Sequence, residues 1–239
     1  MKSLRLVFTG AEKCPDYTYQ ALKKINPQAI LCEGYGITEC SPLVSINRVE
    51  NPQPGTIGRV MPSMEYAIID PETNRRVNIG DQGILLVRGP NIFGGYYGSK
   101  NGDGFSAFEE KRWYNTGDFV KEDNEGVLTF CGRKKRFIKL GGEMISLPAI
   151  ENALLVNFSA NNGHDGPTLA VEATPTDERP EIVLFTTLPI SREEANQKIK
   201  EAGLSPLHNI RILQKVEAIP VLGTGKTDYK QLQKMLVDA

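Results

Sequence analysis

The segment Glu33-Gly34-Tyr35-Gly36-Ile37-Thr38-Glu39 follows a short apolar run and could hold a nucleotide phosphate. Its two glycines let the backbone approach a planar ligand closely. The hydroxyl of Thr38 and the carboxylate of Glu39 suit a phosphate oxygen and its Mg²⁺ ion. A dinucleotide-binding GxGxxG motif is excluded, since Glu39 stands where the third glycine belongs. The alternative is a tight strand-to-loop turn without a ligand.

A second candidate is Asp118, which ends the segment Trp113-Tyr114-Asn115-Thr116-Gly117-Asp118 and is expected to open a strand. A carboxylate accepts two hydrogen bonds at once, which matches the vicinal hydroxyls of a ribose. The alternative is an aspartate that simply ends a turn, a common use of this residue.

Five basic residues stand within the seven positions from Arg133 to Lys139. Such a run is usually a solvated face, and nucleic-acid binding is the sharper alternative. The net charge of −1, from 28 basic and 29 acidic residues, argues against a nucleic-acid partner. The apolar Phe137 and Ile138 indicate that a strand begins inside the run.

A last candidate is Lys226, in the segment Pro220-Val221-Leu222-Gly223-Thr224-Gly225-Lys226-Thr227. The segment is similar to the end of a phosphate-binding P-loop, but Pro220 occupies the place of the first glycine, so a P-loop NTPase is excluded. What remains is a lysine on a glycine-rich loop. Its ammonium group is a point charge with three donors, suited to a developing negative charge.

The helices and strands expected to position these residues belong to two fold classes, α/β and α+β. Residues 1 to about 70 are expected to form a β-α-β unit of a parallel sheet, with strands at 4–8 and 29–32 and a helix at 15–25. Turn-rich short strands between about 64 and 131 predict a small β-barrel or β-rich subdomain. Its expected strands are 64–70, 83–88, 118–121 and 127–131.

After Gly132 the pattern restarts as a compact α+β domain of normal size. Gly141-Gly142 predicts a hairpin turn between strands at 137–140 and 143–146. Ser191 and Glu194 predict a capping box. Further expected elements are helices at 148–156 and 228–237 and strands at 168–173, 182–187 and 210–216. We therefore expect domains at 1–132 and 133–239.

Composition bounds the remaining possibilities. The 239 residues are 40% hydrophobic and 24% charged, as in ordinary globular proteins. The four cysteines show no CxxC spacing, so reduced thiols in a cytosolic protein are expected. His164 and His208 stand alone and are expected at the surface. No apolar run approaches the roughly 20 residues that span a bilayer, and a core strand directly after Met1 suggests that the chain is cut from something longer.

Taken together and in this order, the motifs resemble the adenylate-forming superfamily of acyl-CoA synthetases, peptide-synthetase adenylation domains and luciferases. The resemblance covers essentially the whole chain. It rests on Gly10-Ala11-Glu12, Tyr35–Glu39, Thr116-Gly117-Asp118, Gly132-Arg133 to Ile150-Glu151, and Gly225-Lys226.

The resemblance implies ATP or AMP and Mg²⁺ as cofactors. It implies that Tyr35 stacks on adenine, Thr38 contacts the α-phosphate, Glu39 holds the metal, and Asp118 and Arg133 bind the ribose. The remaining nucleotide-binding positions implied in this way are Gly10, Ala11, Glu12 and Gly36.

By the resemblance, the second half of the chain would form a small domain that rotates during the reaction. By the resemblance, Lys226 bridges the carboxylate and the α-phosphate, Gly141 and Gly142 line a tunnel for the carrier thiol, and Arg136 marks a hinge. Arg136 departs from the superfamily, in which many members have an aspartate at the hinge. The Ser/Thr/Gly-rich phosphate loop and most of the acyl pocket are also missing from these residues, so the chain by itself is expected not to form acyl-AMP.

Five segments carry a closer resemblance: Tyr35–Cys40, Pro90-Asn91-Ile92, Lys135-Arg136-Phe137, Gly142–Leu147 and Leu222–Lys226. They are similar to the synthetase part of bacterial bifunctional acyl-acyl carrier protein synthetase/2-acylglycerophosphoethanolamine acyltransferases. It implies fatty acid and acyl carrier protein as partners, a lysophospholipid as the final acceptor, a cytoplasmic location for this chain, and a parent protein associated with the inner membrane only through parts absent here. The alternatives are a fatty acyl-CoA synthetase fragment that uses CoA, and a non-catalytic module that binds a nucleotide or a carrier protein.

Overall fold

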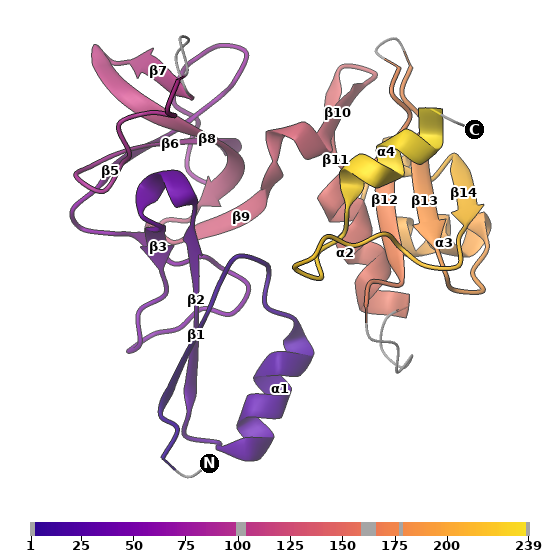
Figure 1. Ribbon diagram of the computed structural model, residues 1–239, viewed down its shortest axis with the longest axis horizontal. Helices are drawn as coiled ribbons and strands as arrows, with labels where there is room; N and C mark the ends of the chain where they lie inside the picture. The colour runs from indigo at the N-terminus through magenta and orange to yellow at the C-terminus, as the bar shows by residue number, and fades with distance from the viewer. Residues whose placement is uncertain (1–2, 99–103, 159–165, 177–178, 238–239) are drawn as a thin grey trace. The chain divides into compact units, whose positions relative to one another are not determined.

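The computed structural model describes residues 3–98, 104–158, 166–176 and 179–237 (Figure 1). The predicted surface residue His164 lies outside these ranges. The chain divides into two compact units, residues 1–134 and residues 135–239. We refer to them as the N-terminal and C-terminal units. The expected division after residue 132, as a boundary between functional domains, stays a prediction.

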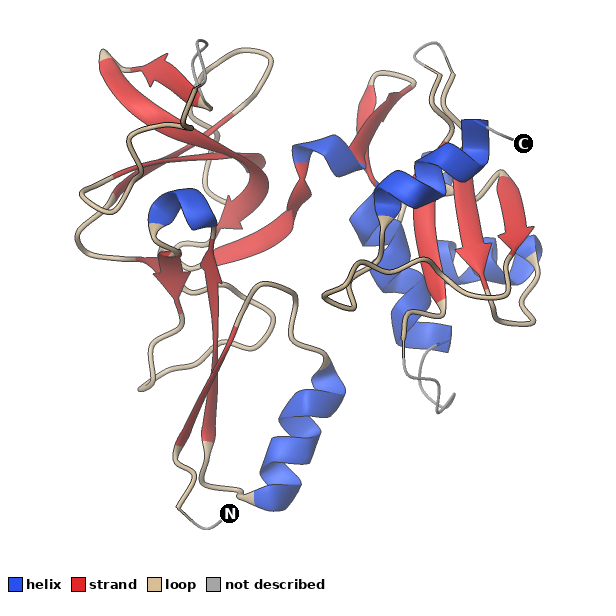
Figure 2. Cartoon of the chain, in the orientation of Figure 1, coloured by secondary structure: helices blue, strands red, loops and turns tan. Residues whose placement is uncertain are grey.

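The N-terminal unit begins with the expected β-α-β arrangement. Strand β1 (Leu6–Thr9) pairs in parallel with β2 (Ile30–Gly36), and helix α1 (Asp16–Ile25) connects them (Figure 2). Strand β2 then pairs antiparallel with β3 (Leu43–Ile46), which pairs with β4 (Arg59–Val60). Helix α1 packs on the sheet through a small core of Cys14, Leu22 and Leu31.

The second sheet of this unit is antiparallel and is the expected β-rich subdomain. It contains β5 (Glu65–Ile69), β6 (Gln82–Arg88), β7 (Phe105–Phe108), β8 (Lys111–Glu122) and β9 (Leu128–Arg133). The order is β5-β6-β8-β7, with β9 also paired to β8. One core joins both sheets and includes Tyr35, Cys40, Val44, Ile68, Leu85, Val87, Tyr114, Val120 and Leu128.

Asp118 does not open a strand, contrary to the prediction. Strand β8 runs through it, and the pairing with β6 shifts between Ile84–Phe119 and Leu86–Asn115. The extra residues form a bulge, in which Gly117 adopts φ 69°. The Thr116 hydroxyl donates to the Leu85 carbonyl at 2.8 Å and accepts from the Asp118 amide at 3.1 Å. The turn-like Thr-Gly-Asp signal therefore marks a bulge within a long strand.

The short 3₁₀ turn η2 (Lys134–Arg136) crosses the boundary between the units, and the expected hairpin follows it in the C-terminal unit. Strands β10 (Phe137–Leu140) and β11 (Glu143–Ser146) pair antiparallel. Gly141 and Gly142 turn the chain with φ 57° and 87°, values that favour glycine.

A three-stranded sheet forms the centre of this unit. Strand β12 (Leu169–Ala173) is antiparallel to β13 (Ile182–Thr186), which is parallel to β14 (Ile212–Lys215). Alternate residues of β12 face opposite sides: Leu169 and Val171 contribute to one core cluster and Ala170 to another.

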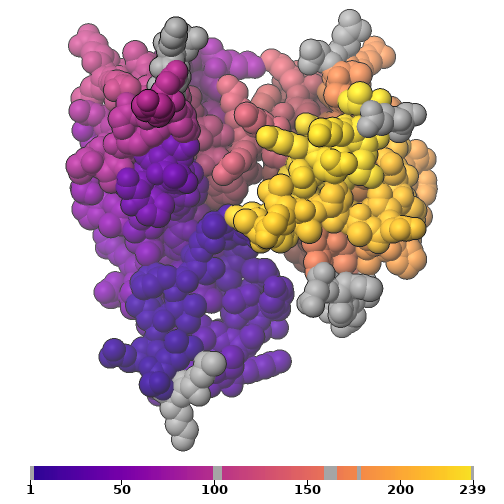
Figure 3. Space-filling model, viewed as in Figure 1, coloured from indigo at the N-terminus to yellow at the C-terminus, as the bar shows by residue number. Residues whose placement is uncertain are grey.

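Helices cover both faces of this sheet. The core of α2 (Leu147–Phe158) and α3 (Arg192–Glu201) lies on one side, and α4 (Tyr229–Val237) packs on the other. The predicted capping box is confirmed, since the Ser191 side chain accepts from the Glu194 amide. The yellow C-terminal segments, α4 among them, lie on the viewed face of this unit (Figure 3).

The cysteines, the helices and the remaining histidine can be described from the same residues. All four cysteines are free thiols. Within the described ranges, no helix is long and apolar enough to cross a membrane, and no group of three or more acidic, histidine or cysteine side chains is placed to hold a metal ion. His208 is half-buried in the short turn η3 (Pro206–His208), 3.0 Å from the Ser205 hydroxyl.

Candidate functional site

The predicted ribose residues Asp118 and Arg133 are cross-strand partners in the β8–β9 ladder. Arg133 Nε lies 3.6 Å from Asp118 Oδ1. The Asp118 side chain is 3% exposed, while that of Arg133 is 72% exposed. The bulge after Asn115 turns Asp118 inward, whereas the end of β9 leaves Arg133 in solvent.

The second oxygen of Asp118 is held by Tyr35. The Tyr35 hydroxyl donates to Asp118 Oδ2 at 2.5 Å. Burial raises the pKa of the Asp118 carboxyl, while the Tyr35 hydroxyl and the Arg133 guanidinium lower it. Burial, together with the charge of Asp118, also raises the pKa of Tyr35, so that its hydroxyl stays a donor. The hydrogen bond from Tyr35 therefore fixes the Asp118 carboxylate, and its Oδ1 atom faces the Arg133 guanidinium.

The aromatic ring of Tyr35 is largely enclosed. Tyr35 is 9% exposed and belongs to the core that joins the two sheets. Its ring stacks on Phe130, with centroids 6.0 Å apart, and Phe130 is 39% exposed. The stacking of adenine on Tyr35 stays a prediction. Phe130 is a second aromatic residue beside the candidate ribose site that the sequence reasoning missed, because an aromatic residue in a strand is usually read as core.

The predicted adenine segment Gly10-Ala11-Glu12 lies against β2. A Cβ atom at Gly10 would come 2.9 Å from the Gly34 carbonyl oxygen, and one at Gly36 would come 2.3 Å from the Pro42 oxygen. Both glycines are therefore required by close backbone contact. Ala11 adopts φ 70°, an uncommon value for a residue with a side chain.

Glu33 holds this region together and was also missed. It is 5% exposed on β2. Its carboxylate accepts from the Cys14 amide at 3.0 Å, from the Gly55 amide at 2.7 Å, and from the Tyr19 hydroxyl. The available signal was an acidic residue directly after an apolar strand, since such a buried charge needs several donors.

The candidate phosphate residues Thr38 and Glu39 form the short turn η1 (Thr38–Cys40) at the end of β2. Thr38 is exposed, and the Glu39 carboxylate accepts from the Tyr96 hydroxyl. The Phe93 amide donates to the Glu39 carbonyl at 2.8 Å and fixes the turn. Magnesium usually binds one or two carboxylates together with substrate phosphates, so a single glutamate at this turn fits that ion.

The other predicted residues lie in the C-terminal unit. Lys226 is exposed on a hairpin-like loop, in which the Leu222 amide donates to the Lys226 carbonyl at 2.7 Å. A Cβ atom on Gly142 would meet nothing within 4 Å, and one on Gly141 would meet only the Leu207 side chain. Arg136 is paired with two carboxylates inside the unit. The structure thus collects the nucleotide candidates in the N-terminal unit and the lysine, hairpin and hinge candidates in the C-terminal unit.

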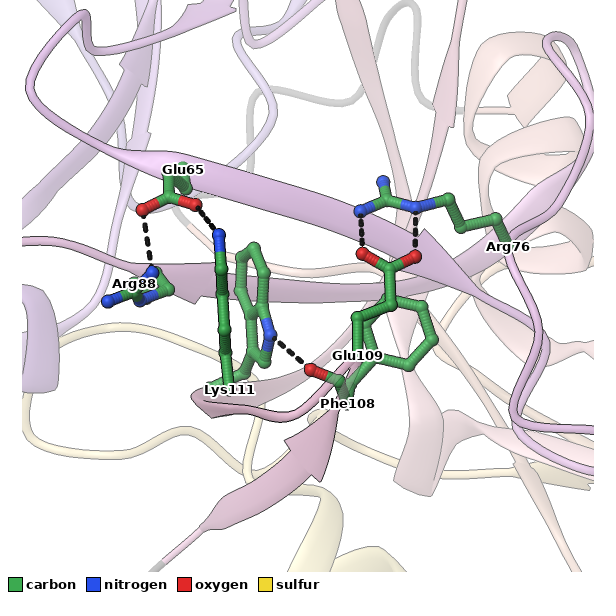
Figure 4. Close-up of polar contacts among 7 residues, drawn as sticks. Glu65, Arg76, Arg88, Phe108, Glu109 and Lys111 are labelled. Carbon is green, nitrogen blue, oxygen red and sulfur yellow. Dashed lines mark hydrogen bonds and ion pairs between the residues drawn. The ribbon is translucent and has the colours of Figure 1, made fainter.

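A cavity of about 460 Å³ on the second sheet contains none of the predicted residues. Figure 4 shows the ion pairs on this sheet, in which Glu65 binds Arg88 and Lys111, each at 2.8 Å. The cavity is lined by Ser63, Glu65, Val87, Arg88, Gly89, Pro90, Ile92, Phe93, Phe105, Arg112 and Tyr114.

Known proteins match this chain over its whole length. Residues 1–97 match the family model described as AMP-binding enzyme. The 4-coumarate–CoA ligase of Pinus taeda is 27% identical over 243 residues, covering 99% of this chain and 44% of the ligase. The long-chain-fatty-acid–CoA ligase of Escherichia coli O157:H7 is 34% identical over 154 residues, covering 64% of this chain and 27% of that enzyme.

Solved structures share the fold. ATP-bound MatB from Rhodopseudomonas palustris superimposes with a TM-score of 0.80 and 22% identity, covering 98% of this chain and 46% of MatB. Residues 1–97 thus match the AMP-binding family, and nearly the whole chain is similar to adenylate-forming ligases. The O-succinylbenzoate coenzyme A synthetase of Bacillus subtilis, solved with ATP and a magnesium ion, has a TM-score of 0.78 and 22% identity, covering 98% of this chain and 47% of the synthetase. The chain spans less than half the length of these relatives.

Proposed function

We propose that this chain is the ribose- and lysine-bearing part of an ATP-dependent acyl ligase that activates a fatty acid as acyl-AMP. The observation that carries the proposal is the pairing of buried Asp118 with exposed Arg133 across β8 and β9. A fixed carboxylate beside a solvent-facing cation offers both an acceptor for ribose hydroxyls and a donor for the nucleotide.

The other roles follow from the chemistry of the step. Attack of a carboxylate on the α-phosphate of ATP brings negative charges together. Lys226 would stabilise the charge that builds up, and Thr38 would donate to the phosphate. Magnesium, held by Glu39 when bound, would neutralise phosphate charge. The Gly10–Glu12 segment and Gly36 would border the base.

The acyl group would then pass to a thiol. We propose acyl carrier protein as the acceptor, with onward transfer to lysophosphatidylethanolamine by parts of the parent protein outside this chain. The parent would be held at the inner membrane and this portion would face the cytoplasm. The similarity to a long-chain-fatty-acid–CoA ligase supports a fatty acid as the substrate, and it keeps CoA as the alternative acceptor.

The test is fatty-acid-dependent exchange of pyrophosphate into ATP by the complete enzyme, followed by addition of carrier protein or CoA to the acyl-AMP formed. We expect exchange, and faster acyl transfer to carrier protein than to CoA. Faster transfer to CoA would assign the chain to an acyl-CoA synthetase. An absence of exchange would overturn the ligase proposal and leave a non-catalytic binding module.

The chain by itself is expected to show no exchange above a blank without enzyme. Its residues lack the Ser/Thr/Gly-rich phosphate loop that the superfamily uses. Measurable exchange by these 239 residues would show that this account of the missing parts is wrong. Duplex DNA serves as a further arm, since the net charge of −1 predicts no binding.

A further inference from the structure

Arg136 is fixed within the C-terminal unit by two carboxylates and an aromatic ring. Its Nη2 atom lies 3.0 Å from Glu151 Oε2, and its Nη1 atom lies 3.2 Å from Glu172 Oε2. The guanidinium carbon stands 3.5 Å from the centroid of the Tyr229 ring. The Arg136 side chain is only 12% exposed. Its planar guanidinium therefore has a defined place among three partners.

Glu151 joins three elements of the unit. Besides Arg136, its Oε2 atom accepts from the Val171 amide at 2.9 Å, and its Oε1 atom accepts from the Tyr229 hydroxyl at 2.6 Å. Among the strands of the described residues, β12 is an edge of its sheet, so the Val171 amide gains from Glu151 a partner that none of these strands supplies. One carboxylate on α2 thus holds β12 and the start of α4.

Glu172 supplies the second negative charge. It lies on β12 with a side chain that is 4% exposed, and its Oε1 atom accepts from the Ala173 amide at 3.1 Å. Glu172, which is buried, and Glu151, whose side chain is 15% exposed, share the Arg136 guanidinium. Removal of that guanidinium would leave both charges without their cation, which is costly in a dry interior.

Tyr229 is the first residue of α4 and follows the loop that carries Lys226. The loop is closed at its base, since the Asp228 amide donates to the Pro220 carbonyl at 2.8 Å and Val221 pairs with Thr227. The C-terminal end of the loop is therefore attached to a residue whose ring and hydroxyl are both held.

We propose that Arg136, Glu151, Glu172 and Tyr229 form a clamp that fixes the base of the Lys226 loop relative to the β10–β11 hairpin. Arg136 and Tyr229 are then positioning residues for adenylate formation, an extension that rests on the proposed function. Under this proposal Arg136 does not turn independently of the C-terminal unit, and any rotation about the predicted hinge falls on backbone bonds that precede it.

The first test needs no activity and uses hydrogen exchange of the 239-residue chain. Tyr229→Phe keeps the ring and removes the hydroxyl bond to Glu151, and Arg136→Gln removes the cation. We expect the Leu222 and Asp228 amides to exchange about threefold or more faster in Tyr229→Phe and at least about tenfold faster in Arg136→Gln. Amides of β1 and β2 should not change. Lys230→Gln, at an exposed position on α4, is the matched control and should leave the loop unchanged.

Exchange of the loop amides at the wild-type rate in folded Tyr229→Phe would overturn the clamp. Equal acceleration of loop and sheet amides of the unit in this mild variant would also overturn it, since that result indicates a general structural role. Arg136→Lys covers the case in which Arg136→Gln fails to fold. It keeps the charge but cannot bind both carboxylates in a planar fork. We therefore expect the loop amides of Arg136→Lys to exchange faster than those of wild type.

The second test uses the two half-reactions of the complete enzyme. Tyr229→Phe should lower the kcat of pyrophosphate exchange about fivefold or more, with little change in the KM for ATP, and should leave transfer from supplied acyl-AMP within about twofold. Equal losses in both half-reactions would contradict the positioning role. A wild-type enzyme without exchange would refute the proposed function, while the hydrogen-exchange result would still decide the clamp.

Discussion

Asp118 and Arg133 face each other as register partners of β8 and β9, one buried and the other exposed. Fifteen positions of sequence separate them, yet the β8–β9 turn brings Arg133 Nε to 3.6 Å from Asp118 Oδ1. The carboxylate is held from the other side by the Tyr35 hydroxyl at 2.5 Å. A ribose approaching from solvent would therefore meet an acceptor whose direction is already set.

Asp118→Asn tests this arrangement. The amide keeps the shape of the side chain but offers one acceptor instead of two oxygens, and it loses its charge. Hydrogen bonds to charged groups contribute about 1.5–3 kcal/mol each, so AMP affinity should fall about 10- to 100-fold. Calorimetric titration of the complete enzyme with AMP measures the loss. Asp81→Asn, in an exposed turn, is the control. Unchanged affinity in Asp118→Asn would remove Asp118 from the site.

For this region the sequence predicted candidate residues, whose roles stay predictions, and the predicted local geometry was wrong. Asp118 was predicted because a carboxylate matches the vicinal hydroxyls of a ribose, and Arg133 because the family resemblance implies it. The strand was predicted to begin at Asp118, whereas the pairing with β6 shows a bulge inside a longer strand; local sequence does not distinguish the two. Phe130 was missed because exposure of a strand residue depends on what packs above it, which no local pattern reveals.

In the C-terminal unit too, features set by neighbouring residues could be predicted, and contacts between distant residues could not. The hairpin at Gly141-Gly142 and the capping box at Ser191 were predicted correctly, since both are set by residues close in sequence. The role of Arg136 could not be read from the basic run. Its partners Glu172 and Tyr229 lie 36 and 93 positions away, and nothing local marks them as partners.

The two half-reactions should separate between Lys226 and Gly142 in the complete enzyme. Lys226→Ala should reduce adenylate formation at least about 100-fold, since a cation at developing charge contributes about 3 kcal/mol. Transfer from supplied acyl-AMP should stay largely intact. Gly142→Leu should do the opposite by filling the thiol tunnel. Pyrophosphate exchange and thioester formation are measured for each variant.

The Gly142→Leu variant needs a control for backbone strain. Gly142 has φ 87°, so any side chain there is unfavourable. Gly142→Ala carries that strain without the bulk, and the tunnel explanation predicts a much smaller loss of transfer than in Gly142→Leu. Equal loss of both half-reactions in Lys226→Ala and in Gly142→Leu would sink the two-site interpretation.

The β7–β8 turn should gain stability from glycine. Glu109 and Glu110 adopt φ 47° and 59°, a conformation that two-residue hairpins usually give to Asn-Gly. Glu110→Gly should raise the free energy of unfolding by about 1 kcal/mol, or the melting temperature by a few degrees, because a side chain in this region is strained. Thermal unfolding followed by circular dichroism measures the change.

Glu109→Gly is the matched variant for that turn. It relieves the same strain but removes the two bonds from Arg76, at 2.7 and 2.8 Å (Figure 4). Its gain should therefore be smaller than that of Glu110→Gly. A larger gain in Glu109→Gly would mean that Arg76 does not stabilise the turn.

Glu172 should make the stability of the C-terminal unit depend on pH. Burial raises its pKa above the usual 4.5, although Arg136 lowers it; Glu151 and Gln233 also face it. A carboxyl with a raised folded pKa binds its proton more readily in the folded state, so stability rises as pH falls through that pKa toward 4.5. Glu172→Gln lacks this proton. As pH falls from about 8 to about 5, the free energy of unfolding of wild type should therefore rise relative to that of Glu172→Gln. Urea unfolding at each pH measures this difference. A difference that is constant across this range would show that Glu172 does not titrate there.

The last prediction concerns the acceptor. Arg133, Lys134 and Lys135 are exposed and concentrate positive charge in a chain of net charge −1. The carrier proteins implied by the family resemblance are strongly acidic, and opposite local charge would steer such a partner to this segment.

Lys134→Glu combined with Lys135→Glu should therefore raise the apparent KM for carrier protein in the complete enzyme, and the KM values for ATP and fatty acid should stay nearly unchanged. Salt shortens the Debye length from about 10 Å at 0.1 M to about 3 Å at 1 M, so wild-type carrier affinity should fall with salt and that of the double variant should fall less. Lys23→Glu with Lys24→Glu, an exposed lysine pair at the end of α1, makes the same charge change elsewhere and should not alter the carrier KM. If the two double variants behave alike at low salt, the run is a solvated face and the carrier binds elsewhere.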